Sequence, residues 1–178
     1  MERENDKFMN LREYSRIDAR IPFEATVVPA EERKDLRSRI SGQTVLSEFQ
    51  NLPDLEDKLL NDWFKMLNAK LDTLLNLMTF QRDGISSLPF TQVNLSAGGI
   101  SFISKQWYNR GDVIEMKMML PMIPPVALYI YGEVVKVEKQ VNIYNIGVRF
   151  IEMDEEITDQ IVKFVFRKQR EILRDKRK

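Results

Sequence analysis

Alternating apolar and polar positions predict a first β-strand at Ile21–Val28, with Pro22 and Pro29 near its ends. The same two-residue period returns after Gly84 and continues to about residue 152. These later segments are rich in Val, Ile, Tyr and Phe, and turn residues separate them. They predict five further strands, at Phe90–Asn94, Gly99–Ser104, Val113–Leu120, Ala127–Lys139 and Asn142–Met153. Six strands in mostly consecutive order favour an antiparallel barrel or a tight sandwich.

A helical period replaces the strand pattern in residues 31–87. The period is weak at first and becomes regular from Asp54 onward, where a heptad seam predicts one long helix. The weak part consists of Leu36, Ile40, Leu46 and Phe49, and the seam consists of Leu60, Phe64, Leu67, Leu71, Leu74 and Met78. A last helix is predicted after Asp154, a suitable N-cap, with one apolar face formed by Ile157, Ile161, Phe164, Val165 and Ile172.

The heptad seam allows two interpretations. The helix could pack with a second helix against the barrel, or it could associate with copies of itself. Further apolar residues widen the surface well beyond a two-stranded seam, namely Leu59, Trp63, Met66, Leu75 and Leu77. A helix this apolar needs more than one neighbour, and alone it would expose a large apolar patch. We therefore expect a homo-oligomer that forms through the seam.

The composition excludes several classes of chemistry. The 178 residues contain neither cysteine nor histidine, which removes thiolate catalysis, imidazole bases and the usual zinc ligand sets. No arrangement of residues selects a catalytic pair, so we expect a protein that is not an enzyme and has no metal or cofactor. The 27 basic residues balance the 27 acidic ones, which gives no overall attraction to a nucleic acid polymer. No apolar run reaches the length of about 18 residues that membrane insertion requires, so we expect a cytoplasmic protein.

Two short motifs carry the candidate binding chemistry. Arg16 and Arg20 form an R-x-x-x-R spacing just before the first predicted strand, and Asn94-Leu-Ser-Ala-Gly-Gly99 lies at a turn between two later strands. Guanidinium groups bind phosphate oxygens and the O6/N7 edge of guanine in a two-pronged geometry. The Asn-x-Ser-x-x-Gly sequence adds short polar side chains on a tight turn. Taken alone, each motif also fits a structural role, as a solvated charged segment or as ordinary turn chemistry.

In this order, each beside a predicted strand end, the two motifs resemble the hallmark of the PilZ domain family. The likeness covers about 8–30 and 88–175. It implies a six-stranded antiparallel barrel with a C-terminal helix. Residues 1–20 would then be an N-terminal arm, and residues 21–178 would be the barrel and its C-terminal helix, interrupted by a helical insertion at 31–87. Ser15 departs from many relatives, which have a basic residue at this position.

The resemblance also implies a function, the binding of the bacterial second messenger cyclic di-GMP. Arg16 and Arg20 would contact guanine edges and phosphates, Asn94 and Ser96 would form hydrogen bonds from the barrel, and Gly99 would keep the turn open. The leading hypothesis is a receptor that converts binding of the messenger into a changed interaction with a downstream protein. The alternative is an oligomeric PilZ-like scaffold that does not bind cyclic di-GMP and acts through protein–protein contacts.

Overall fold

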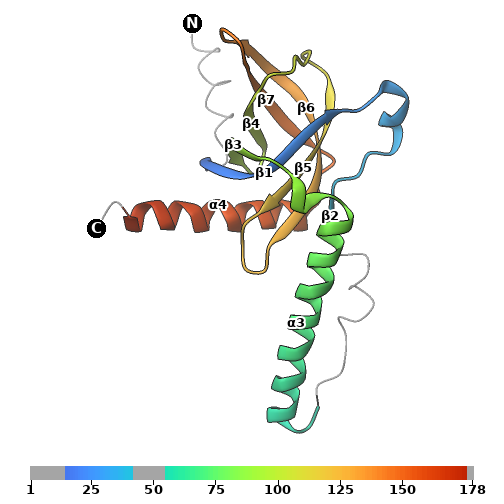
Figure 1. Ribbon diagram of the computed structural model, residues 1–178, viewed down its shortest axis with the longest axis vertical. Helices are drawn as coiled ribbons and strands as arrows, with labels where there is room; N and C mark the ends of the chain where they lie inside the picture. Colours follow the sequence, from blue (N-terminus) through green and yellow to red (C-terminus); the bar gives the residue numbers. More distant parts are fainter. Residues whose placement is uncertain (1–14, 42–54, 176–178) are drawn as a thin grey trace, which may run out of the picture.

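Six antiparallel strands close into a barrel, and a seventh short strand extends it (Figure 1). A computed structural model describes residues 15–41 and 55–175. The strands of the barrel follow one another in the order β6-β5-β1-β3-β4-β7, and pairing between β6 and β7 closes the ring. Their bounds are Ile17–Val27 for β1, Phe90–Ser96 for β3, Gly99–Ser104 for β4, Val113–Leu120 for β5, Val126–Lys139 for β6 and Tyr144–Ile151 for β7. The barrel prediction is confirmed.

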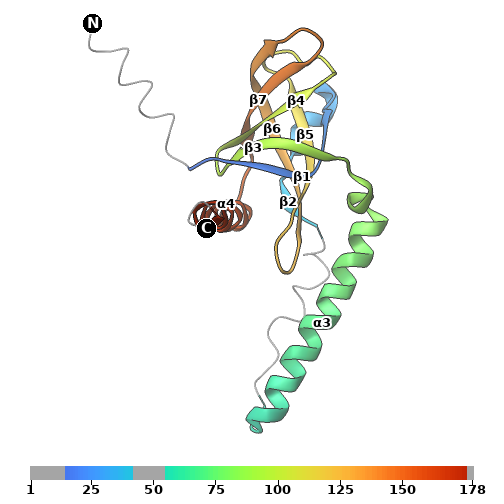
Figure 2. The same ribbon diagram turned by 60° about the vertical axis from the view of Figure 1, so that its left-hand side comes forward.

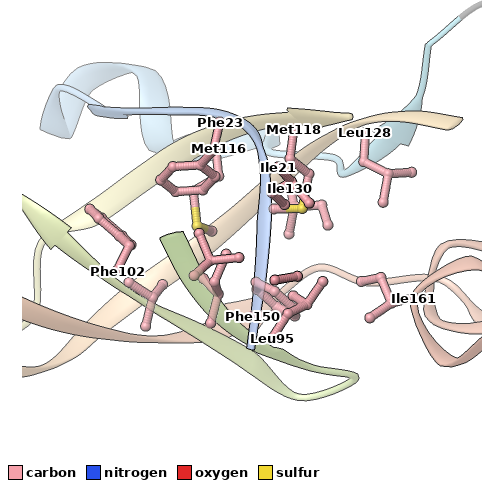
Figure 3. Close-up of a cluster of buried hydrophobic side chains, with 14 of the residues drawn as sticks. Ile21, Phe23, Leu95, Phe102, Met116, Met118, Leu128, Ile130, Phe150 and Ile161 are labelled. Atoms are coloured by element: carbon pink, nitrogen blue, oxygen red, sulfur yellow. The ribbon is translucent and has the colours of Figure 1, made fainter. Parts of the chain in front are cut away.

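The barrel interior is filled by the apolar half of each alternating strand pattern. In β5, for example, every second residue from Ile114 to Leu120 is fully buried. Side chains from several strands meet in one core, where the rings of Phe23 and Phe102 lie 4.8 Å apart between centroids (Figure 3). Because side chains of a strand alternate between its two faces, the remaining positions form the outer wall of the barrel.

Strand β1 begins at Ile17, four residues before the predicted start. Ile17 and Ala19 are buried in the core together with Ile21, so the inward alternation already starts in the segment that was expected to be an arm. Its charged residues hide this pattern because they occupy the outward positions. The pairing of β1 changes after Pro22, from β3 to β5. A proline fits such a position because it has no N–H group to donate to a ladder.

The segment between β1 and β3 is only partly helical. A 3-10 helix, η1 at Ala30–Asp35, leads to the short strand β2 at Arg39–Ile40, which pairs with β6. The helical assignment of Ile40 was therefore wrong, since its backbone bonds to the sheet. Leu46 and Phe49 lie outside the described residues. The heptad pattern does form one helix, α3 at Lys58–Arg82, whose N-cap Asp57 accepts a hydrogen bond of 3.0 Å from the Leu60 amide.

Helix α3 touches the barrel at its C-terminal end and extends away from it (Figures 1 and 2). Phe80 is its one buried residue among those described, and it packs with Ile85, Ala127 and Tyr129 in a small apolar cluster. Ile85 belongs to the 3-10 turn η3 at Ile85–Ser87, which follows Gly84 in the left-handed conformation. The joint between helix and barrel is thus short and leads directly into β3.

Helix α4 spans Glu155–Asp175 and covers part of the barrel core. Asp154 caps it as predicted, accepting a hydrogen bond of 3.0 Å from the Ile157 amide. The predicted apolar face is buried at Ile157, Ile161, Phe164 and Val165. Ile172 is 39% exposed, because the helix continues beyond the barrel (Figure 1). None of the described helices is both long and apolar enough to cross a membrane.

Candidate functional site

The fold brings the two sequence motifs side by side on the outer wall of the barrel. Strands β1 and β3 pair antiparallel, with Asp18 opposite Asn94. Asp18 lies midway between Arg16 and Arg20, and the side-chain amide of Asn94 donates a hydrogen bond of 2.8 Å to Asp18 Oδ1. Since Ile17 and Ala19 face the core, the alternation directs these charged residues outward. Motifs that are far apart in the chain therefore share one surface.

The Asn-x-Ser-x-x-Gly motif forms the hairpin turn between β3 and β4. Ser96 and Gly99 are paired across the turn, and the buried Ser96 hydroxyl donates a hydrogen bond of 3.1 Å to the Gly99 carbonyl. On the other side, Gly99 pairs with β7, and a Cβ atom at this position would lie 2.4 Å from the Val148 carbonyl oxygen. Glycine is therefore required here by the contact between strands, whether or not a ligand binds.

An open cavity of about 520 Å³ lies over this turn. Four of the five predicted ligand residues line it, namely Arg16, Asn94, Ser96 and Gly99. The size falls within the usual range for small-molecule sites. Arg20 is exposed on the outer face of β1 opposite Gln92, and it does not line the cavity. The structure thus gathers four of the five residues and places Arg20 two outward positions after Arg16.

The far wall of the cavity comes from β6 and β7, which the sequence prediction did not include. It contributes Lys136 and Arg149, and a bulge in the pairing of the two strands brings Lys136 opposite Gly147. A Cβ atom at position 147 would lie 3.0 Å from the Lys136 Cβ, so glycine here leaves room for the Lys136 side chain. The signal was present in the alternation of Tyr144–Phe150, whose outward positions are polar or glycine.

The charged side chains that line the cavity are cationic. Its lining includes three cationic side chains, those of Arg16, Lys136 and Arg149, and none of the described lining residues is acidic. Three carboxylates stand just outside, and one of them, Asp18, accepts the hydrogen bond from Asn94. Glu133 Oε2 lies 2.6 Å from Arg149 Nη2, and Glu138 Oε1 lies 2.8 Å from Lys136 Nζ. The hydrogen bond from Lys136 lowers the pKa of Glu138, so this carboxylate stays ionised. Such a lining suits an anionic ligand with hydrogen-bonding edges.

Comparisons with known proteins agree with this fold. No curated protein matches the chain. A tetrameric PilZ domain protein from Xanthomonas campestris, self-assembled through a helical bundle, is similar in structure with a TM-score of 0.59 and 18% identity, over 91% of this chain and 92% of that one. The inhibitor of motility MotI/DgrA from Bacillus subtilis has a TM-score of 0.50 and 13% identity, over 89% of this chain and 51% of that one. This chain therefore spans about half of MotI/DgrA.

A family model gives the assignment that these structural likenesses cannot give alone, because at such low identity they show only the fold. The model of the PilZ domain matches residues 75–167, which is more than half of the chain. The matched stretch runs from the end of α3 through strands β3 to β7 into α4; it includes the Asn94–Gly99 turn, whereas β1 precedes it. This chain belongs to the PilZ domain family.

Proposed function

We propose that this PilZ domain protein is a non-enzymatic, cytoplasmic receptor for cyclic di-GMP. The observation that carries the proposal is the cavity over the Ser96–Gly99 turn, whose lining brings together Arg16, Asn94 and Ser96. The ligand has two phosphates and two guanines, so it needs cations and short polar groups together. The output would be a changed interaction with a downstream protein that controls motility, biofilm formation or a surface organelle.

In this proposal each motif residue has a stated role. Arg16 binds a phosphate or a guanine edge at the rim of the cavity, while Asn94 and Ser96 form hydrogen bonds with the ligand from β3. Arg20 contacts the part of the ligand that extends beyond the cavity along β1. Because Ile17 and Ala19 are packed in the core, a ligand-dependent movement would have to involve the chain before Ile17.

The test is calorimetric titration of the purified protein with cyclic di-GMP. Arg16→Ala and Arg20→Ala should each weaken binding by about 1.5–3 kcal/mol, the usual value of a hydrogen bond to a charged group. Arg37→Ala is the matched control, since Arg37 is exposed and lines a different surface hollow. Wild-type protein that gives no heat and no shift in its thermal unfolding midpoint would overturn the receptor proposal. Unchanged affinity in both arginine variants would overturn the assigned contacts.

We also propose that α3 associates with α3 of other copies of this chain. All six seam residues, from Leu60 to Met78, have between 48% and 68% of their surface exposed. Trp63, Leu75 and Leu77 beside the seam are exposed as well. Apolar residues beside a heptad seam become buried when more than two helices assemble. The three exposed residues beside this seam therefore favour a bundle over a two-stranded coiled coil. The helical bundle of the similar Xanthomonas campestris protein supports this proposal.

The second candidate function is a scaffold that assembles through α3 and does not bind the messenger. The exposed α3 surface favours it, whereas the cavity lined by Arg16, Asn94 and Ser96 favours the receptor. Deleting residues 31–87 is a poor way to separate them, because it also removes β2 and the Phe80–Ile85 contact with the barrel. Substitutions on the exposed seam leave the barrel intact and test assembly and messenger binding independently.

A further inference from the structure

Arg149 is directed toward the candidate site by the alternation of β7. Its neighbours Val148 and Phe150 are buried in the core, and the Arg149 side chain is 63% exposed on the outer wall. Arg149 is opposite Gly99 on β4, and Gly99 is opposite Ser96 on β3. Because Gly99 has no side chain, no side chain stands between Ser96 and Arg149 in this cross-strand row.

A second arginine approaches the same turn from the other side. Arg16 directly precedes Ile17, which pairs with Leu95 beside Ser96, and both Arg16 and Ser96 line the cavity. The strand order β1-β3-β4-β7 therefore places the Ser96–Gly99 turn between two arginines. One comes from the first motif and the other from a strand that neither motif includes.

Arg149 is oriented by Glu133 on β6. The two residues are opposite each other in the β6–β7 ladder, and Arg149 Nη2 donates a hydrogen bond of 2.6 Å to Glu133 Oε2. This bond uses one of the five N–H donors of the guanidinium. The pair is exposed and therefore weak, and it leaves four N–H donors of the oriented guanidinium for a ligand.

A purely structural role explains less of this arrangement. Backbone pairing from Tyr131 to Lys139 already joins β6 to β7, so the barrel does not need the ion pair to close. A structural role also gives no reason for Arg149 to share the lining of one cavity with Arg16, Asn94 and Ser96. Gly98, Gly99 and Gly147 also line this cavity, so these three positions contribute no side chain to it.

We infer that Arg149 is an additional ligand-binding residue, which holds a phosphate of the bound dinucleotide against the Ser96–Gly99 turn, opposite Arg16. Its planar guanidinium donates two parallel hydrogen bonds to phosphate oxygens, a geometry that lysine cannot reproduce. Glu133 is a positioning residue that acts only through Arg149. This inference rests on the proposed function, because it names one more contact of the same ligand.

The test is titration with cyclic di-GMP of wild-type protein and four variants: Arg149→Ala, Arg149→Lys, Glu133→Ala and the double variant Arg149→Ala/Glu133→Ala. Arg149→Ala should raise the Kd about tenfold, equivalent to about 1.4 kcal/mol. The Kd of Arg149→Lys should lie between those of wild type and Arg149→Ala, since the charge remains and the two-pronged contact is lost. Glu133→Ala should weaken binding less than Arg149→Ala does. In the Arg149→Ala background, Glu133→Ala should cause no further loss of affinity.

The controls separate binding from folding and this inference from the proposed function. Arg37→Ala should bind like wild type, and the unfolding midpoint of ligand-free Arg149→Ala should match that of wild type. Arg149→Ala with wild-type affinity overturns the inference and leaves the receptor intact. Arg149→Lys with wild-type affinity overturns the two-pronged contact, and additive losses in the double variant overturn the role of Glu133. Wild-type protein that does not bind overturns the receptor proposal itself.

Discussion

The side-chain amide of Asn94 donates a hydrogen bond of 2.8 Å to Oδ1 of Asp18, the residue midway between the two arginines of the first motif. The two residues are also directly opposite each other in the β1–β3 ladder. This contact joins the two motifs without any ligand. It also gives a physical reason for asparagine at position 94, since an aspartate there would face a second carboxylate.

Asn94→Asp should therefore destabilise the barrel. Like charges directly opposite each other in a ladder cost about 0.2–1 kcal/mol, and the effect should be larger at low salt. Asp18→Asn in the same chain should restore the lost stability, because the new carboxylate regains a neutral partner. Denaturant unfolding of the two single variants and the double variant measures this coupling. Equal unfolding free energies for wild type and Asn94→Asp at low salt would contradict it.

Gly99→Ala should destabilise the protein more than Gly147→Ala does. At position 99 the new methyl group would meet the Val148 carbonyl oxygen at 2.4 Å, and a paired backbone cannot move away easily. At position 147 it would meet the Lys136 Cβ at 3.0 Å, which is a less severe overlap. Overpacking of the first kind costs about 1–3 kcal/mol. Thermal unfolding of the two variants tests this, and equal losses would show that the β4–β7 contact is not the reason for glycine.

Much of the barrel could be predicted from the sequence, because one face of each strand is buried. For the alternation in Val113–Leu120, only one orientation of the strand buries Ile114, Met116 and Met118. The strand in the structure has the predicted bounds. The start of β1 was missed because its outward residues are charged, although Ile17 and Ala19 are buried. Strand β2 has two residues and no period to detect.

The candidate site was predicted only where a local motif marked it. Arg16, Asn94 and Ser96 come from such motifs, and they do line one cavity. The alternation in Tyr144–Phe150 marks Arg149 as an outward residue, but only strand pairing and the bulge between β6 and β7 bring Arg149 and Lys136 to this cavity. Residues that reach a site through register between distant strands can be assigned only when the register is known.

The joint between α3 and the barrel should weaken in acid. Burial disfavours the charge of Asp83, but hydrogen bonds from Arg82 and Ser41, at 3.1 and 3.2 Å, outweigh it and lower its pKa. A carboxyl whose pKa is lower when folded adds stability above its unfolded pKa of about 3.9, and this stability is lost as the pH falls through the folded value. The stability difference between wild type and Asp83→Asn should therefore be constant near neutral pH and shrink below about pH 4.

Denaturant unfolding of wild type and Asp83→Asn from pH 7 to pH 3 measures that difference. Ser41→Ala serves as the partner variant, because it removes one hydrogen bond to the carboxylate and should reduce the same pH-dependent difference. Stability curves of wild type and Asp83→Asn that stay parallel across this range would show that Asp83 does not contribute through its charge.

Substitution of the heptad seam should dissociate the proposed oligomer without unfolding the barrel. Leu67→Asp/Leu71→Asp places two carboxylates at exposed seam positions, where association would have to bury them. The matched control is Ala69→Asp/Asn76→Asp, which adds the same side chains on the opposite face of α3. Light scattering should give a mass near the 21.0 kDa of one chain for the seam variant and the wild-type mass for the control.

Messenger binding then separates the two functions. The candidate cavity lies on the barrel, and α3 meets the barrel only around Phe80 among the described residues. A receptor should therefore keep its affinity for cyclic di-GMP in the seam variant, even as the mass falls to that of one chain. A wild-type protein that already has the mass of one chain, or a control that dissociates like the seam variant, would contradict association through the seam. Loss of binding together with assembly would instead mean that the site is complete only between copies.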